Sequence, residues 1–218
     1  MCFFTKLVSK PKAIENRFEA KFDLGHSYQS AEILNGFSFP KQPVILDSSP
    51  SRIQEFYWGL VPHWANDLLV RKYTLNAKIE TLNEKPSFRA SQNKRCLVVV
   101  DGFYEWQWLD SKGKEKQKYF ISAAAKAPFA LGGIWASYND ANTGETYNSY
   151  SVVTTPANKL MSKIHNTKQR MPVIITQELQ DSWLNTENTD FFAVQNPELT
   201  AIKVFDNFDD QYRMQSLF

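Results

Sequence analysis

The second residue of the chain is a cysteine, and its position gives it a distinctive chemistry. We expect Met1 to be removed, because methionine aminopeptidases act when residue 2 is small. Cys2 then carries an α-amine of pKa about 8 beside a thiol of pKa about 8.5. Amine and thiol together can close a thiazolidine ring on an aldehyde, or the thiolate can attack an acyl carbon. An incidental surface Cys or a palmitoylation site is the plainer interpretation, so the hypothesis requires partner residues.

Two polar motifs that follow strand-like segments supply candidate partners. In Asn-Ala-Lys-Ile-Glu-Thr at 76–81, Asn76 either caps a following helix, the better interpretation on its own, or orients a reacting carbonyl or amine. Lys78 in the same motif would meet a phosphate. In Asp-Gly-Phe-Tyr-Glu-Trp at 101–106, Glu105 lies among aromatic residues, where desolvation raises a carboxyl pKa and suits proton transfer. The alternative for Glu105 is the solvent face of an amphipathic strand.

A histidine, an arginine and a tryptophan complete the candidate site. Of three His residues, only His165 lies between a predicted helix and a predicted strand among polar neighbours, a position typical of active groups. The alternative is an ordinary loop His. Arg170 precedes an apolar strand and either binds phosphate or pairs with an acid. Trp58 and Trp64 flank a Gly-Leu-Val-Pro-His segment; Trp58 is expected in the core, whereas Trp64 is free to stack on a nucleic-acid base.

Length and composition limit the class of protein. The 218 residues are 43% hydrophobic and 14% aromatic, with a net charge of +2, as in an ordinary globular domain. This charge permits a polyanionic partner without requiring one. The sequence contains no apolar run of about 18 residues and no signal peptide, so we expect a cytoplasmic protein that makes no use of a membrane. With only Cys2 and Cys96, the sequence predicts no disulfide framework, no metal site and no cofactor.

Strand patterns dominate the chain, and the helices are predicted to be short. The first 50 residues read as irregular, apart from a helix at 13–20, because Pro11, Pro40, Pro43 and Pro50 interrupt them. The predicted strands are 52–58, 95–100, 102–108, 118–123, 129–138, 146–155 and 171–175. Two more helices are predicted at 156–164, capped by Thr155, and at 177–184, capped by Thr176. We therefore predict an α+β fold: a single domain, 1–218, with a mostly antiparallel, barrel-like sheet core.

The motifs occur in a recognisable order: Met-Cys, Trp-Gly-x-x-Pro, Asn-Ala-Lys-x-Glu-Thr, Gly-Phe-Tyr-Glu-Trp, and a His before Arg-Met-Pro. Over residues 2–175 the chain resembles the SRAP family, the SOS-response-associated peptidase-like proteins that crosslink to abasic sites in single-stranded DNA. The resemblance implies that Cys2 forms a thiazolidine with the abasic-site aldehyde and so shields the lesion. It implies that Asn76 holds the Cys amine and the sugar, that Glu105 is the general acid and base, and that His165 promotes Schiff-base chemistry and reversal.

The resemblance also implies a DNA-binding surface. It assigns phosphate binding to Lys78 and Arg170, and the lining of the DNA groove to Trp64, Pro40, Met171 and Pro172. The chain departs from the family at three places: Phe3-Phe4 replaces a usual Gly-Arg, residues 166–169 separate His165 from Arg170 where one residue is usual, and Ala65 follows Trp64 where a second Trp is common. Lys85, Arg89 and Lys168 are candidates to compensate for the missing Arg.

Two other functions remain open at the level of sequence. One is a cysteine peptidase or N-terminal-nucleophile amidohydrolase, with self-processing of Met1 as a possible activity; the absence of a glycine-rich oxyanion motif beside Cys2 weakens it. The other is a non-enzymatic module that binds single-stranded DNA. The favoured hypothesis is a lyase-like, monomeric crosslinking enzyme of the DNA damage response that associates with the nucleoid when bound to DNA.

Overall fold

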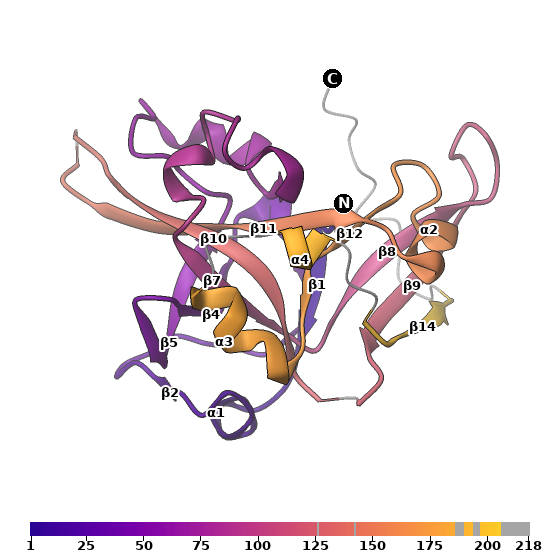
Figure 1. The fold of residues 1–218 in the computed structure, drawn as a ribbon, viewed down its shortest axis with the longest axis horizontal. Helices are drawn as coiled ribbons and strands as arrows, with labels where there is room; N and C mark the ends of the chain where they lie inside the picture. The colour runs from indigo at the N-terminus through magenta and orange to yellow at the C-terminus, as the bar shows by residue number, and fades with distance from the viewer. Residues whose placement is uncertain (126, 142, 186–189, 194–196, 206–218) are drawn as a thin grey trace.

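Strands are the main regular elements of the molecule, as the computed structural model shows for residues 1–125, 127–141, 143–185, 190–193 and 197–205 (Figure 1). The strands are β1 (Phe4–Leu7), β2 (Lys21–Phe22), β3 (Ala31–Asn35), β4 (Lys41–Leu46), β5 (Ser49–Trp58), β6 (Asn76–Lys78), β7 (Arg95–Val100), β8 (Gly102–Trp108), β9 (Lys116–Ala123), β10 (Phe129–Asn139), β11 (Thr146–Pro156), β12 (Arg170–Pro172), β13 (Ile174–Ile175) and β14 (Leu199–Val204). The α-helices are α1 (Pro11–Phe18), α2 (Lys159–Ile164), α3 (Gln180–Asn185) and α4 (Asp190–Ala193). No described helix has the length and apolar character needed to cross a membrane.

Five of the strands close into a barrel. The order β11-β10-β7-β4-β5 is antiparallel throughout, and β5 then pairs in parallel with β11 through Tyr57 and Trp58. This ring has no free edge among its own strands, which removes the aggregation hazard of an open sheet. The predicted fold class, α+β with a mostly antiparallel, barrel-like core, is confirmed; the end of the predicted single domain, 206–218, lies outside the described residues.

A second sheet carries the N-terminus into the molecule. Its order is β14-β9-β8-β1-β3, and β1 lies antiparallel to β8 with Phe4 opposite Tyr104. Because the strands run in opposite directions, the residues before Phe4 continue alongside the residues after Tyr104. The pairing of β1 with β8 therefore brings the first residues of the chain to Glu105.

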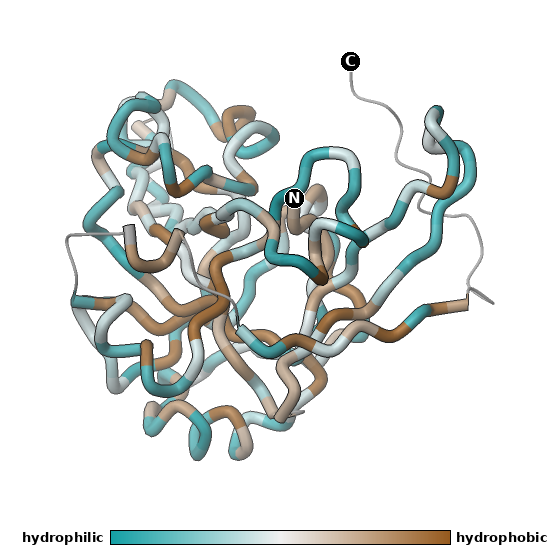
Figure 2. Tube along the Cα trace, turned by 45° about the vertical axis from the view of Figure 1, so that its right-hand side comes forward, coloured by the Kyte–Doolittle hydropathy of each residue, from teal (hydrophilic) through white to brown (hydrophobic). Residues whose placement is uncertain are grey.

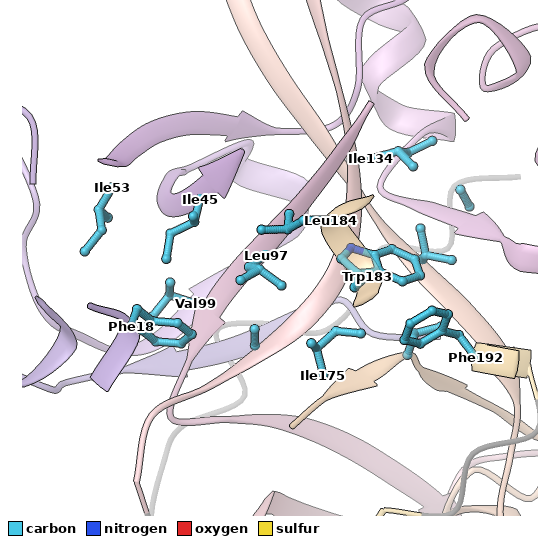
Figure 3. Close-up of a cluster of buried hydrophobic side chains, with 14 of the residues drawn as sticks. Phe18, Ile45, Ile53, Leu97, Val99, Ile134, Ile175, Trp183, Leu184 and Phe192 are labelled. Atoms are coloured by element: carbon cyan, nitrogen blue, oxygen red, sulfur yellow. The ribbon is translucent and has the colours of Figure 1, made fainter. Parts of the chain in front are cut away.

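Both faces of β7 are buried, which explains its apolar run from Cys96 to Val100. Leu97 and Val99 point into a cluster with Trp183 and Leu184 of α3 (Figure 3), and the Trp183 indole N–H donates to the Cys96 carbonyl at 2.9 Å. The alternate residues of β7, which are Cys96, Val98 and Val100, join a second cluster that includes Cys2. In Figure 2 the hydrophobic stretches follow the central strands, whereas the outer loops are largely hydrophilic. The nucleophile candidate thus belongs to the core.

Several predicted elements are matched closely, and others are corrected. The strands at 95–100 and 102–108 match β7 and β8, and the helix at 13–20 is α1, shifted toward Pro11 at its first turn. The expectation of an irregular start was wrong, because β1 and β4 form there by pairing with β8 and β7, and β3 pairs with β1. Pro43 is tolerated in β4 because β7 pairs with β4 only from Val44 onward.

The predicted helix boundaries also needed correction. Asn158, not Thr155, caps α2, accepting a hydrogen bond from the Met161 N–H at 2.9 Å. Residues 171–175 are not one strand, because β12 and β13 are separated at Val173. The predicted helix at 177–184 is a 3-10 turn followed by α3; Thr176 does precede it, without a side-chain cap bond.

Candidate active site at the N-terminus

The α-amine of Met1 lies between two buried titratable side chains. It donates to Glu105 Oε2 at 3.2 Å and approaches His165 Nε2 at 2.9 Å. Glu105 comes from β8 and His165 from the end of α2, and their Oε2 and Nδ1 atoms are 3.6 Å apart. In Figure 1 the N-terminus lies near β12, between the barrel and the β8–α2 side of the molecule. The structure thus brings two of the predicted site residues together around an amine.

The carboxyl group of Glu105 is almost removed from solvent, with 7% of the residue exposed. Burial raises its pKa from an ordinary 4.5 to about 7, although the positive charge of the Met1 amine acts in the opposite direction. The solvent-face alternative for Glu105 is therefore wrong. A carboxyl with a pKa near neutrality populates both its acid and its base form there, as proton transfer in both directions requires.

His165 is buried at the C-terminal end of α2, with 7% of the residue exposed, so it is not an ordinary exposed loop His. Its Nδ1 lies 2.7 Å from the Arg170 carbonyl oxygen. The Arg170 N–H also lies 3.2 Å from Nδ1, so the tautomer decides which contact forms. With the proton on Nδ1, the ring donates to the Arg170 carbonyl and Nε2 accepts from the amine. Burial, and then the nearby positive charge of Met1, lower the His165 pKa to about 4, so the ring is neutral at neutral pH.

The residues between His165 and Arg170 form a compact loop that turns the chain back toward His165. Asn166 accepts from the Trp108 N–H at 3.1 Å and donates to the Trp108 carbonyl at 2.9 Å, which attaches the loop to β8. Gln169 adopts φ +49° and its N–H donates to the His165 carbonyl at 2.9 Å. The loop therefore brings Arg170 back beside His165 despite its added length.

Cys2 is fully buried beside this pair, and its Sγ lies 4.0 Å from the Phe4 carbonyl. Burial raises the pKa of the thiol, and the negative charge of Glu105 raises it further. The Cys2 carbonyl accepts from Asn76 Nδ2 at 2.8 Å, while Asn76 Oδ1 is buried with no hydrogen-bond partner among the described residues. Asn76 begins β6, which pairs in parallel with β11, so its interpretation as a helix cap was wrong.

Arg170, predicted to bind phosphate, is engaged within the protein. Its guanidinium forms a two-pronged ion pair with Glu80, at 2.5 and 2.9 Å, and donates to the Thr154 carbonyl at 2.6 Å. Sequence reasoning gave no role to Glu80, although it belongs to the same motif as Asn76 and Lys78. The signal in the sequence was the position of Glu80, an acid two residues after the candidate phosphate-binding Lys78.

The other residues predicted to bind DNA differ in their exposure. Lys78, Lys85 and Arg89 are exposed, Pro40 is partly exposed, and Trp64 is 49% exposed with its indole N–H on the Pro86 carbonyl at 3.2 Å. Met171 and Pro172 are buried in β12 and do not face solvent. Lys168 is exposed on the loop before Arg170. Within the described part of the chain, no three His, Cys, Asp or Glu side chains gather as metal ligands would.

Comparison with known proteins supports the family resemblance that the order of the motifs indicates. "Abasic site processing protein YoqW" of Bacillus subtilis (strain 168) is 40% identical over 148 residues, which are 67% of this chain and 63% of that protein. "Abasic site processing protein YoaM" of the same bacterium is 35% identical over 176 residues, 78% of this chain and 74% of that protein. The chain thus matches less than two thirds of the length of YoqW.

A solved structure shows the same fold. A protein from Bacteroides thetaiotaomicron superimposes with a TM-score of 0.84 at 34% identity, over 94% of this chain and 93% of that chain. A family model described as SOS response associated peptidase (SRAP) matches residues 1–206. The chain belongs to the SOS response associated peptidase family.

Proposed function

We propose that the chain binds single-stranded DNA and captures the aldehyde of an abasic site on Cys2, as a thiazolidine crosslink that shields the lesion. The observation that carries this proposal is that buried Glu105 and buried His165 hold the α-amine of Met1, one residue before the buried Cys2. An amine needs a proton acceptor before it attacks a carbonyl, and the resulting adduct needs a proton donor to lose water. Glu105, with a pKa of about 7, can serve as both.

The chemistry proceeds in two balanced steps once Met1 has been removed. The Cys2 amine adds to the aldehyde carbon, and loss of one water leaves a C=N double bond. The Cys2 sulfur then adds to the same carbon while its proton passes to the imine nitrogen, closing the ring. The net change is one water released, with no oxidant, reductant or cofactor. We propose Glu105 as the acid and base in both steps, and neutral His165 as the acceptor that keeps the amine nucleophilic.

Asn76 offers a reason why the new amine would stay in place. Its Nδ2 already holds the Cys2 carbonyl, while its Oδ1 is an acceptor buried without a partner. A buried acceptor without a partner is costly, about 1–3 kcal/mol. The α-amine of a processed Cys2 supplies a donor on the same residue, three bonds from the carbonyl oxygen that Asn76 already holds. We therefore propose that Asn76 grips Cys2 by both its carbonyl and its amine.

An abasic nucleotide presents no base, so binding depends on phosphates and on stacking of neighbouring bases. We propose Lys78, Lys85 and Arg89 as phosphate contacts and exposed Trp64 as a stacking residue. Arg170 would contact a phosphate only if its guanidinium left Glu80, or bound Glu80 and the phosphate at the same time. We also propose that the chain acts as a monomer in the cytoplasm, where reducing conditions keep Cys2 free; light scattering of the purified protein tests the monomer.

The test uses single-stranded DNA with one abasic site and protein whose intact mass shows that Met1 is absent. We expect a species that survives a denaturing gel and whose mass equals protein plus DNA minus one water. Cys2→Ala should abolish it. Cys96→Ala is the matched control, since it removes the other buried thiol from the same core cluster and should leave the crosslink intact. No crosslink from verified Cys2-terminated protein would contradict the proposal.

One observation keeps a peptidase activity as the second candidate. The Met1–Cys2 peptide bond itself lies in the site, with its free amine held by Glu105 and His165. Hydrolysis of that bond by one water would expose Cys2 without another enzyme. Incubation of unprocessed protein, followed by intact mass, tests this: loss of Met1 that requires Cys2 and Glu105 supports self-processing, and a stable Met1 over days excludes it.

A further inference from the structure

A pair of aromatic rings lies directly beside the candidate nucleophile. Phe3, the residue after Cys2, faces Phe37 with ring centroids 4.9 Å apart and an interplanar angle of 30°. Both rings are partly exposed, although both also touch the core cluster that contains Cys2. Phe3 is one of the positions at which this chain departs from the usual Met-Cys-Gly-Arg start. The proposed chemistry has no use for this pair.

The backbone around the pair is fixed. The Gly36 N–H donates to the Phe3 carbonyl at 2.8 Å, and the Asn35 side chain accepts from the Phe37 N–H at 3.0 Å. Gly36 has no room for a side chain, because a Cβ there would lie 3.2 Å from the Phe3 carbonyl oxygen and 3.3 Å from the Trp58 ring. The rings are therefore held in place before any ligand arrives, which lowers the entropy cost of stacking a ligand on them.

A cation from the 3-10 turn Leu68–Tyr73 packs against Phe39, which ends the Phe37 loop. Phe39 has φ +52°, a conformation that bulky residues rarely adopt, and the Arg71 guanidinium lies 4.5 Å from its ring centroid. A Cβ on Gly59 would lie 3.2 Å from the Phe39 ring and 3.0 Å from Arg71 Cβ, so these three residues pack tightly together. Rings beside a guanidinium match the alternation of base and phosphate along a single strand.

We propose that Phe3 and Phe37 form a stacking shelf for the nucleobase next to the abasic nucleotide, with Arg71 facing the adjoining phosphate. The inference rests on the proposed crosslinking function and adds a substrate preference to it. A flat aromatic shelf favours a neighbouring purine over a pyrimidine, because the purine has the larger face.

The alternative is that the two rings only complete the hydrophobic core. The two cases differ in whether the crosslinking rate depends on the DNA sequence beside the lesion. Core packing affects the stability of the protein equally for every substrate, whereas a shelf makes the crosslinking rate depend on the base beside the lesion. The informative quantity is therefore a ratio of rates between substrates within each variant, from which losses of active protein cancel.

The experiment compares crosslinking rates at subsaturating DNA on oligonucleotides whose lesion has adenine neighbours, or has one neighbour replaced by a base-free spacer, on the 5′ and the 3′ side in turn. For the wild type we expect adenine to exceed the spacer by about fivefold or more on one side. Phe3→Leu, which keeps an apolar side chain without a flat face, should reduce this ratio to about one, and Phe3→Trp should restore it. Phe191→Leu, at an exposed ring on α4, is the matched control and should leave the ratio unchanged.

A wild-type ratio near one on both sides, or an unchanged ratio in Phe3→Leu, overturns the shelf. The minimal aldehyde 2-deoxyribose 5-phosphate separates this result from failure of the proposed function, since it has no neighbouring base. Adduct formation on this sugar at equal rates in wild type and Phe3→Leu, measured by intact mass, supports the shelf. If the wild type forms no adduct with either the sugar or the oligonucleotides, the crosslinking function itself has failed.

Discussion

Replacing Glu105 by Gln should stabilise the folded protein at high pH while it impairs the proposed chemistry. Glu105 has a pKa of about 7 in the fold against an ordinary 4.5 in the unfolded chain, mainly because it is buried. The folded state therefore binds the proton more tightly, and the free energy of unfolding falls as pH rises from about 4.5 through about 7. At about 1.36 kcal/mol per pH unit, ionisation of Glu105 costs the fold about 3 kcal/mol at high pH. A neutral Gln has no such cost.

The assay is urea unfolding of wild type and Glu105→Gln at about pH 5 and about pH 8. We expect similar stabilities at the lower pH and a variant more stable by about 2–3 kcal/mol at the higher pH, which for a chain of this size raises the Tm by roughly 5–10 °C. Crosslinking should fall by at least about 100-fold. Glu115→Gln, at an exposed position, controls for the change of charge. If the stability of Glu105→Gln depended on pH in the same way as that of the wild type, the reasoning that the folded protein retains a proton on buried Glu105 would be refuted.

Three further changes test other contacts of the site and core. Asn76→Ala removes the bond to the Cys2 carbonyl, so the free energy of unfolding, measured in urea, should fall by about 1 kcal/mol. The crosslinking rate, measured by gel, should fall by more than the loss of folded protein accounts for. Glu80→Gln releases Arg170 from its ion pair, so binding of abasic DNA should tighten a few-fold with a steeper salt dependence, measured by fluorescence anisotropy; unchanged affinity would show that Arg170 takes no part. Trp183→Ala empties a fully buried site and should cost about 3–5 kcal/mol, again measured by urea unfolding.

The strands that sequence reasoning located best are those whose pattern is local. Residues 96–100 form an unbroken apolar run, and β7 is buried on both faces, so the sequence pattern agrees with the environment of the strand. The first 50 residues failed for the opposite reason. β1, β3 and β4 are short, and β4 contains Pro43; β8 and β7 pair with β1 and β4 from far along the chain, and β3 in turn pairs with β1. Propensity within a window carries no information about such partners.

At the site, residue types were predictable but their pairing was not. Aromatic neighbours indicated a desolvated Glu105, and burial with a raised pKa confirms that environment. The ion pair between Arg170 and Glu80 joins residues 90 positions apart, which no spacing rule reaches. The helix-cap interpretation of Asn76 failed because β6 pairs with β11, a contact set by the closing of the barrel. Long-range pairing thus decided which polar side chains met Cys2.

Retention of Met1 should change the chemistry of the site and not merely its rate. The Met1 amine, seated on Glu105 and His165, can still form an imine with an aldehyde, but the Cys2 thiol would have to close a much larger ring than a thiazolidine. The unprocessed protein should therefore form only a reversible imine, which survives a denaturing gel after cyanoborohydride reduction, whereas processed protein should crosslink without reductant. Intact mass identifies the two forms in each sample. A stable, reductant-independent crosslink on Met1-bearing protein would show that the ring between amine and thiol is not the trap.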